Sequence, residues 1–329
     1  MRRISLTLFF FCLIYLVNIA PIEAKDRVTA KALPHYIQAG IYERLNQLDK
    51  AAREYKVALK ADYRSPHIHL RLAIVLLKGN QLSQATEELK LAIKYYDTQT
   101  PPSKPSSSFI EAHTLLALVY SLQGKMDEAT AEYETALRGA IALEPDNIRI
   151  HKSLARVYLR KNKFSDAEKT YRFILDLVPS DFQAHFFLGT VYEEQDRRYE
   201  AIEEFKAALK FNPEYHEALN SLGYLYAEES INLEKAEGMI KKALIYEPDN
   251  GAYIDSLGWV HFKQGRYQEA VEELEQAIQF LSDPIIYEHL GDVYQKLGNQ
   301  IKAKENWQKS LEIDSEQNLR VKQKLEQYQ

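Results

Sequence analysis

An alanine recurs along most of the chain at an interval close to 34 residues. The alanines are Ala51, Ala85, Ala129, Ala167, Ala201, Ala236, Ala270 and Ala303. A period of this length indicates a repeat array, in which each unit buries its apolar face only against its neighbours. The sequence therefore favours a linear array over the two conventional domains that 329 residues would otherwise suggest.

A small residue stands twelve or thirteen positions before each alanine. The small residues are Ala39, Ala73, Ala117, Ala155, Gly189, Gly223, Gly258 and Gly291, and a leucine precedes all but the first. Small side chains let two helix backbones approach closely, as the packing of a helix pair requires. A single repeat of this kind could not bury its apolar face alone.

Residues that tolerate a left-handed backbone or stop a helix separate the apolar segments. Asparagine, aspartate or glycine is expected to end the first helix of a pair at Asn80, Gly124, Asn162, Asp196, Gly265 and Gly298. Proline follows the second helix at Pro145, Pro179, Pro213 and Pro248. The pattern predicts an all-α fold built from helix-turn-helix units.

The order of these columns resembles the tetratricopeptide-repeat (TPR) family. The resemblance is clearest in Leu188-Gly189-Thr190-Val191-Tyr192 followed by Ala201, Phe205, Ala208 and Pro213. It implies a right-handed α-solenoid of about eight repeats, with repeats 1–2 at residues 32–97, repeats 3–8 at 110–315 and a capping helix at 316–329. It also implies a scaffold for other proteins, without identifying the partner.

Three departures from the period mark expected irregularities. A Pro/Ser-rich segment at residues 98–109 accounts for the longest spacing and predicts an exposed loop. The third repeat carries about one extra helical turn before Pro145, and the sixth has one residue inserted near Ser230-Ile231-Asn232.

The first 24 residues read as a secretory signal peptide. Met1-Arg2-Arg3 is basic, an apolar run follows, and Ala24 provides a small residue before Lys25. We expect cleavage before Lys25, a linker at residues 25–31, and a periplasmic or secreted protein. The alternative is an uncleaved inner-membrane anchor at residues 4–22, facing the periplasm, which would be the chain's only membrane contact.

Composition and motifs argue against several function classes. The formal net charge of −5 disfavours a nucleic-acid partner. Cys12, the only cysteine, lies in the expected leader, and no catalytic, cofactor or metal motif stands out.

Five histidines recur near the repeat period, at His35, His69, His113, His151 and His185. We interpret them as packing residues of the first helices and expect no enzyme activity, cofactor or metal.

The family's inner groove is lined by defined positions of each first helix, and the resemblance assigns those positions here. Carried over residue by residue, they give Arg149, Lys152, Arg156, Phe186, Phe187, Glu217, Tyr224, Asp255, Trp259, Phe262 and Asp292. The basic residues fall in the fourth repeat and the acidic ones in repeats six to eight. The hypothesis is a polarised groove that binds a protein or peptide carrying basic and aromatic residues; the alternative is that the aromatic side chains only pack.

The functional prediction is a non-catalytic protein-interaction scaffold of the bacterial cell envelope, which captures a partner segment in this groove. Two alternatives stay open. One is a membrane-anchored or self-associating structural component, and the other is an accessory subunit of a polysaccharide or pilus export system. The sequence fixes neither the partner nor the oligomeric state.

Overall fold

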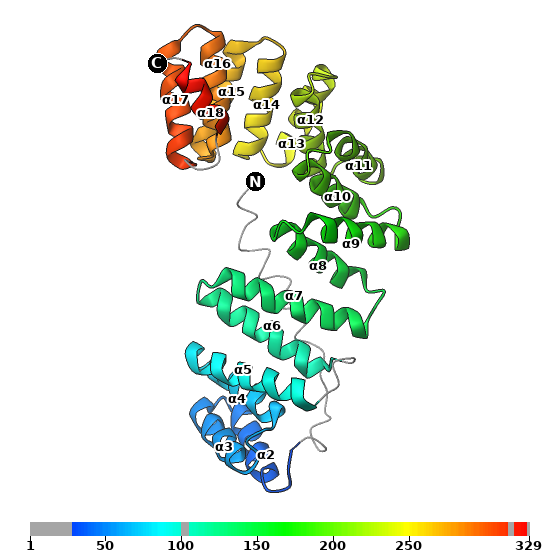
Figure 1. The fold of residues 1–329 in the computed structure, drawn as a ribbon, viewed down its shortest axis with the longest axis vertical. Coiled ribbons are helices and arrows are strands. Elements are labelled where there is room, and N and C mark those ends of the chain that lie inside the picture. Colours follow the sequence, from blue (N-terminus) through cyan, green and yellow to red (C-terminus); the bar gives the residue numbers. More distant parts are fainter. Residues whose placement is uncertain (1–27, 100–104, 315–318, 328–329) are drawn as a thin grey trace. The chain divides into compact units, whose positions relative to one another are not determined.

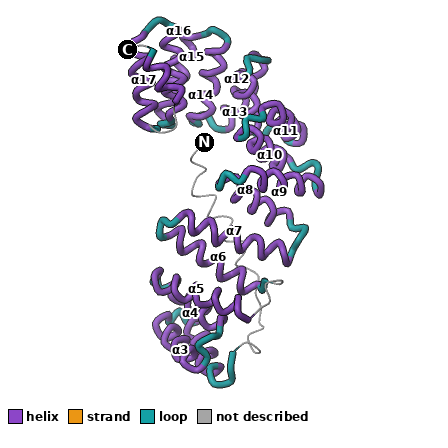
Figure 2. The backbone as a smooth tube through the Cα atoms, in the orientation of Figure 1, coloured by secondary structure: helices purple, strands orange, loops and turns teal. Residues whose placement is uncertain are grey.

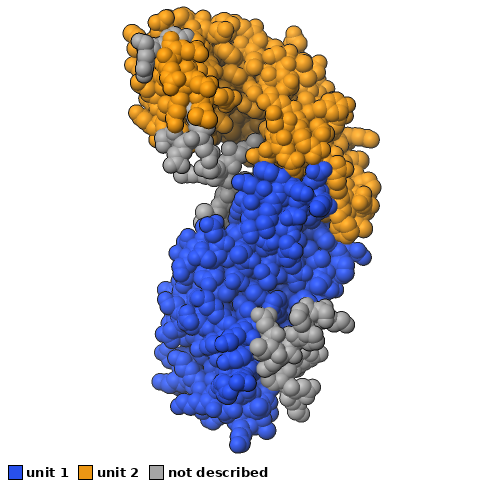
Figure 3. Space-filling model, in the orientation of Figure 1, with its two compact units in different colours: residues 1–170 blue, residues 171–329 orange. Residues whose placement is uncertain are grey.

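A computed structural model of the chain describes residues 28–99, 105–314 and 319–327. Throughout these ranges the regular secondary structure is α-helix, and the helices follow one another in pairs (Figures 1 and 2). The all-α solenoid is therefore confirmed. The chain divides into two compact units, residues 1–170 and 171–329 (Figure 3). The boundary between them lies inside one helix.

Unit 1 consists of three helix pairs and a further first helix. Its helices are α2 (Leu33–Arg44), α3 (Leu48–Ala61), α4 (Pro66–Lys78), α5 (Leu82–Gln99), α6 (Ser107–Leu122), α7 (Met126–Leu143) and α8 (Ile148–Arg160). α9 (Phe164–Leu177) crosses the boundary between the units. The second helices α3, α5 and α7 also pack against the next first helices, α4, α6 and α8.

Unit 2 continues the same arrangement. Its helices are α10 (Phe182–Glu194), α11 (Arg198–Phe211), α12 (His216–Glu228), α13 (Leu233–Tyr246), α14 (Gly251–Lys263), α15 (Tyr267–Phe280), α16 (Pro284–Lys296), α17 (Gln300–Ile313) and α18 (Leu319–Glu326). The first helices α12, α14 and α16 are neighbours, so their exposed sides form one surface. We call the exposed sides of α10, α12, α14 and α16 the first-helix surface of unit 2.

The column of small residues lies where the two helices of a repeat touch. A methyl group added at Gly258 would lie 2.8 Å from Leu274 Cγ, and one added at Gly223 would lie 2.7 Å from Ile240 Cγ1. Such distances are well below an ordinary van der Waals contact. The large residue of the second helix therefore occupies the space that glycine leaves.

The turn residues adopt the backbone conformation expected of them. All six positions predicted to end a first helix have a positive φ, from 54° at Asn162 to 78° at Gly265. In the sixth repeat, Ser230 and Asn232 have φ values of 55° and 49°. The extra residue is thus accommodated by a second left-handed residue in the turn before α13.

The bounds of α5, α6 and α7 bear on two of the predicted joints. α7 has 18 residues where α9 and α11 have 14, which is the extra turn expected in the third repeat. The Pro/Ser-rich loop is shorter than the predicted 98–109, because α5 continues to Gln99 and α6 begins at Ser107. The side chain of Ser106 caps α6 by accepting a hydrogen bond from the Phe109 N–H at 3.2 Å. Residues 100–104 lie outside the described residues.

The two ends of the chain differ from the predicted boundaries. The expected signal peptide and the first part of the linker lie outside the described residues. Val28 is buried in the core of the first repeats, so the end of the expected linker belongs to the fold. None of the helices in the described ranges is long and apolar enough to cross a membrane. At the other end, Val321 of α18 is fully buried against the core that contains Trp307, as a capping helix requires.

Four of the five periodic histidines join the two helices of their repeat. Each Nδ1 lies 2.6 or 2.7 Å from a glutamate 19 residues later, in the pairs His35–Glu54, His69–Glu88, His113–Glu132 and His185–Glu204. In the fourth repeat Thr170 stands at the glutamate position, and His151 Nε2 hydrogen-bonds the Pro145 carbonyl. The histidines therefore do more than pack, because they link the two helices through a polar contact.

The bridge in the fifth repeat makes its stability depend on pH. The hydrogen bond to Glu204 raises the pKa of His185, although burial acts in the opposite direction. A histidine whose pKa is higher in the folded state than in the unfolded state stabilises the fold when it is protonated. Its contribution to the free energy of unfolding is complete below the ordinary pKa of 6.5, and it disappears as pH rises through the folded-state pKa. His185→Gln should therefore lower the free energy of unfolding more at about pH 6 than at about pH 9, as measured by urea titration. In a Glu204→Gln background the difference between the two pH values should shrink, because Glu204 is the largest cause of the raised pKa.

Candidate protein-binding surface

The expected basic residues form a stripe on one side of α8, in unit 1. Arg149, Lys152 and Arg156 are spaced three and four residues apart and so share a face of the helix. Arg149 is exposed and the other two are half-buried. The remaining expected residues belong to unit 2 and are described separately.

Phe186 and Phe187 pack within the fold as well as facing outward. Phe187 stacks on Tyr171 with ring centroids 5.8 Å apart, and Phe186 contacts Phe205 and Tyr215 at 5.6 and 5.1 Å. Both rings are half-buried. Phe187 thus contacts the second helix of the preceding repeat, and Phe186 contacts the second helix of its own repeat and the start of the next. These contacts give both rings a structural role, so they offer only part of each ring to a ligand.

Trp259 lies in the middle of an aromatic stack. Its ring is parallel to those of His289 and Phe262, with centroids 3.9 and 4.7 Å away and interplanar angles of 15°. Its Nε1–H donates to Glu228 Oε1 at 2.5 Å, and only 7% of the residue is exposed. The expectation that Trp259 is an exposed groove residue is wrong, because the next first helix covers the ring.

A buried ion pair supports the stack. Asp255 Oδ1 lies 2.8 Å from His289 Nδ1, and both residues are buried. Burial disfavours the charged imidazole, but the carboxylates of Asp255, Asp292 and Glu288 outweigh it and raise the pKa of His289. Asp255 is therefore committed to an internal partner rather than to a ligand.

The cap helix α18 neutralises the acidic residues of α16. Lys324 Nζ donates to Glu288 Oε1 at 2.9 Å and to Asp292 Oδ2 at 2.6 Å, and Arg320 donates to Glu288 at 3.3 Å. Asp292 also accepts from Trp307 Nε1 at 3.0 Å. The prediction that Asp292 is available to a basic ligand is wrong in this respect, since the chain supplies the lysine itself.

On α10 and α12, three buried oxygen atoms have no hydrogen-bond donor among the residues that the structure describes. They are Glu193 Oε2, Glu217 Oε2 and Asn220 Oδ1. Glu217 Oε2 does lie 3.5 Å from His216 Nδ1, which is too far for a strong ion pair. Buried acceptors are normally satisfied. Glu217 and Asn220 lie in the first turns of α12, whereas Glu193 lies at the end of α10 and is close to Glu228 at the other end of α12.

The electrostatic environment of Glu193 is unusual for a carboxylate. Burial raises its pKa to about 7, and the negative charges of Glu194 and Glu228 contribute in the same direction. Tyr224, half-buried on α12, also has a raised pKa because of burial and the nearby Glu228. A cation bound at this position would favour the ionised form of Glu193.

The sequence identified only part of this surface. Glu217 and Tyr224 were predicted, whereas Asn220 was missed because a lone asparagine on a helix carries no distinctive signal. The pairing of Lys324 with Glu288 was also missed. The spacing of Arg320 and Lys324 by four residues was an available signal, because it places two cations on one side of the cap helix.

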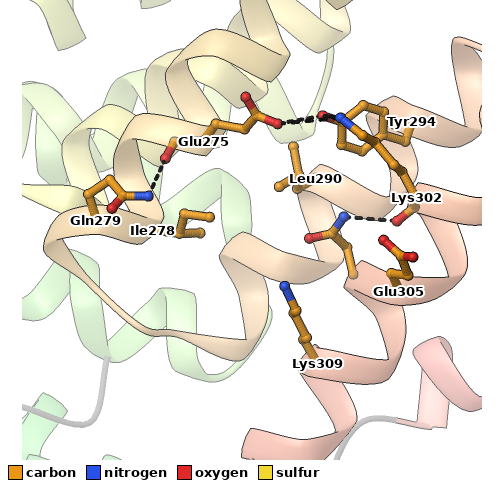
Figure 4. A pocket seen from close by; sticks show the side chains of 9 residues that line it. Glu275, Ile278, Gln279, Leu290, Tyr294, Lys302, Glu305 and Lys309 are labelled. Carbon is orange, nitrogen blue, oxygen red and sulfur yellow. Dashed lines mark hydrogen bonds and ion pairs between the residues drawn. The ribbon is translucent and has the colours of Figure 1, made fainter.

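An open pocket of about 310 Å³ lies elsewhere in unit 2, between α15, α16 and α17 (Figure 4). Tyr294 donates to Glu275 Oε1 at 2.5 Å, and Lys302 donates to the Tyr294 hydroxyl at 3.0 Å. The pocket is also lined by Ile278, Gln279, Leu290, Glu305, Asn306 and Lys309. Because the polar side chains at its centre already bond one another, we do not assign it a ligand.

In the described ranges, no group of three or more His, Cys, Asp or Glu side chains is arranged to hold a metal ion.

Successive helix pairs with a close-packed column of small residues define an α-solenoid repeat protein, a class whose exposed helix faces serve as binding surfaces. Models of the tetratricopeptide repeat match residues 38–103, 153–216, 108–179 and 285–317, and a TPR repeat model matches residues 258–298. Together these matches cover more than half of the chain. The chain belongs to the tetratricopeptide-repeat family.

Individual relatives add little beyond the fold. The TPR repeat-containing protein PA4667 of Pseudomonas aeruginosa is 38% identical over 58 residues, which are 18% of this chain and 10% of that protein. A tetratricopeptide repeat protein from Parabacteroides merdae has a TM-score of 0.58 at 18% identity, over 78% of this chain and 96% of that one. PilF of Pseudomonas aeruginosa has a TM-score of 0.51 at 17% identity, over 67% and 97%.

Proposed function

We propose that this protein is a non-catalytic scaffold of the bacterial cell envelope, and that it binds a partner segment on the first-helix surface formed by α10 and α12. The family supports the general role, because its repeats act as protein-interaction modules. The basic and apolar composition of residues 1–24 supports export. The basic stripe of Arg149, Lys152 and Arg156 is a proposed second contact region.

The observation that carries the proposal is that both α10 and α12 carry buried acceptors for which the described residues provide no donor. Glu193 and Glu217 each leave one buried carboxylate oxygen without a donor, and Asn220 adds an amide oxygen. Further along the first-helix surface, α18 shows how the chain itself satisfies such acids, namely with Lys324 and Arg320. A partner segment with lysine or arginine would provide the same kind of donor on α10 and α12.

Affinity capture from the envelope fraction of the host tests this proposal. The bait is the full chain, compared with a Glu193→Gln/Glu217→Gln double variant. A partner bound by this surface should be retained at least about tenfold less well by the variant, since hydrogen bonds to charged groups contribute about 1.5–3 kcal/mol each. Capture by the unaltered chain should weaken as salt rises from about 0.05 to 0.5 M.

A matched control separates this surface from a general effect of charge. Glu203 and Glu272 are exposed acids on the second helices α11 and α15, and Glu203→Gln/Glu272→Gln removes the same two charges. This control should retain the partner. Because the pKa of Glu193 is about 7, capture should also strengthen from about pH 6 to about pH 8, and Glu193→Gln should flatten that dependence. Equal loss in both double variants would contradict binding at α10 and α12.

A further inference from the structure

One histidine of α14 stands where most repeats carry a tyrosine. The residue three positions after the small one is tyrosine in six of the eight repeats, Leu76 in the second and His261 in the seventh. His261 is only 3% exposed. Neither of its ring nitrogens has a hydrogen-bond partner among the residues that the structure describes. Buried polar atoms are normally paired, so this imidazole is an exception.

A positive charge lies next to the His261 ring. In three of the tyrosine repeats the residue five positions later is a cation over the ring, namely Lys125 over Tyr120, Lys163 over Tyr158 and Arg197 over Tyr192. The face of a tyrosine ring attracts such a cation. In the seventh repeat this position is Arg266, and its backbone N–H donates to the His261 carbonyl at 2.9 Å. A neutral imidazole tolerates the guanidinium, whereas a protonated one would be repelled by it.

Arg266 also joins the seventh repeat to the sixth. Its Nη1 donates to Glu237 Oε2 of α13 at 2.9 Å, and Gln264 Nε2 donates to the same oxygen at 3.1 Å. We call these two hydrogen bonds the Glu237 link. Arg266 Nε donates in addition to Glu269 of α15 at 2.7 Å. Carboxylates of two second helices therefore hold the guanidinium beside His261.

The carboxylates near His261 are already paired with other cations. Glu237 Oε1 lies 3.5 Å from His261 Nε2, but it accepts from Lys241 of the same helix at 2.6 Å. Glu269, on α15, is the partner of Arg266. A protonated His261 would have to draw Glu237 away from its present donors before it gained a short ion pair.

The sum of these surroundings disfavours the charged form of His261. Burial lowers its pKa, and the positive charge of Arg266 acts in the same direction. Glu237 and Glu269 act in the opposite direction without offsetting the other two causes. In the fifth repeat the result is reversed, because a carboxylate at 2.6 Å raises the pKa of His185.

We propose that His261 makes the contact between the sixth and seventh repeats sensitive to pH, so that the Glu237 link is closed while the imidazole is neutral and opens when it takes up a proton. In the closed form the proton adds a second positive charge beside Arg266 in a buried space. In an open form the ring is hydrated and titrates as an ordinary histidine, so the open form binds the proton more tightly. Acid therefore shifts the population toward the open form as the pH falls below about 6.5.

Opening of this link would act on two neighbouring first helices. α14 is joined to the sixth repeat at a second place, where Trp259 Nε1–H donates to Glu228 of α12. Both helices belong to the first-helix surface of unit 2. The arrangement of that surface thus depends on the Glu237 link, whether or not a partner binds there.

Hydrogen exchange of the full chain tests the proposal. The reference is His261→Tyr, which restores the residue that most repeats carry at this position. The exchange rate of the unaltered chain is divided by that of the variant, at about pH 5 and at about pH 8, so that the intrinsic effect of pH on exchange cancels. For peptides from α13, α14 and the turn before α15, this ratio should be at least about threefold higher at pH 5, the factor that a pKa difference of about half a unit produces. Peptides from α6 and α7 should give the same ratio at both pH values.

A second variant covers the case in which the larger tyrosine ring does not fit. Arg266→Gln removes the adjacent positive charge, so exchange at the Glu237 link should rise less between pH 8 and pH 5 than in the unaltered chain. Arg197→Gln, which changes the equivalent residue of the fifth repeat, should keep the full rise. A His261→Tyr ratio that is equal at the two pH values would overturn the proposal. So would an equal change in the α6 and α7 peptides, or an Arg266→Gln variant that keeps the full rise.

Discussion

Trp259→Ala is expected to destabilise unit 2 by about 3–5 kcal/mol, the range found when a buried large aromatic residue is truncated. The substitution leaves a cavity between Phe262 and His289 and removes the donor to Glu228. It also uncovers the buried Asp255–His289 pair. Urea titration followed by circular dichroism measures the loss as a lower transition midpoint for part of the helical signal.

Tyr199→Ala is the matched control for this substitution, because Tyr199 is an aromatic residue of the same unit that is 75% exposed. It should change the free energy of unfolding by no more than about 0.5 kcal/mol. If Trp259→Ala instead folded with unchanged stability and lost its partner, the ring would be a binding residue, as the sequence first suggested.

Gly258→Leu should lower the stability of unit 2 by about 1–3 kcal/mol, the usual cost of adding bulk to a well-packed core. The Cβ alone would lie 2.8 Å from Leu274 Cγ and 3.3 Å from the Ala270 carbonyl oxygen, so two helices would have to separate. Thermal unfolding should show a lower melting temperature.

A second glycine of the same unit should respond in the opposite direction. Gly238 lies inside α13, and nothing is within 4 Å of a methyl group added there. Gly238→Ala should therefore raise stability by about 0.5–1 kcal/mol, because alanine loses less backbone freedom on folding into a helix. A stabilising Gly258→Leu would mean that the two helices of the seventh repeat do not approach as closely as described.

The local architecture was predictable because it depends on short-range constraints that recur in every repeat. Residue 258 has to be small because the Leu274 side chain packs against it. Residue 265 has to tolerate a positive φ because the chain turns there. Eight in-phase copies made such constraints visible in the sequence alone. The extra turn of α7 could be predicted for the same reason, because it places Pro145 about one helical turn later than the repeat pattern implies.

The hydrogen bonds and ion pairs within and between repeats were harder to predict from the sequence. The 19-residue spacing between His185 and Glu204 is present in the sequence, but a histidine at a packing position gives no sign that its ring is bonded. Asn220 was missed because only the folded arrangement shows that its amide oxygen is buried without a donor. Hydrogen bonding depends on distances between side chains that a repeat register does not specify.

The sequence by itself determined that this protein is a TPR solenoid, where its turns lie and which side of each first helix faces outward. Only the tertiary structure decided which outward residues another segment covers. Lys324 reaches Asp292 across 32 residues. His289, on the next first helix, bonds Asp255 and covers Trp259, so two acids and an aromatic residue of the predicted groove have internal partners. The physical reason is that helical periodicity fixes the direction of a side chain, whereas its exposure depends on contacts between distant segments.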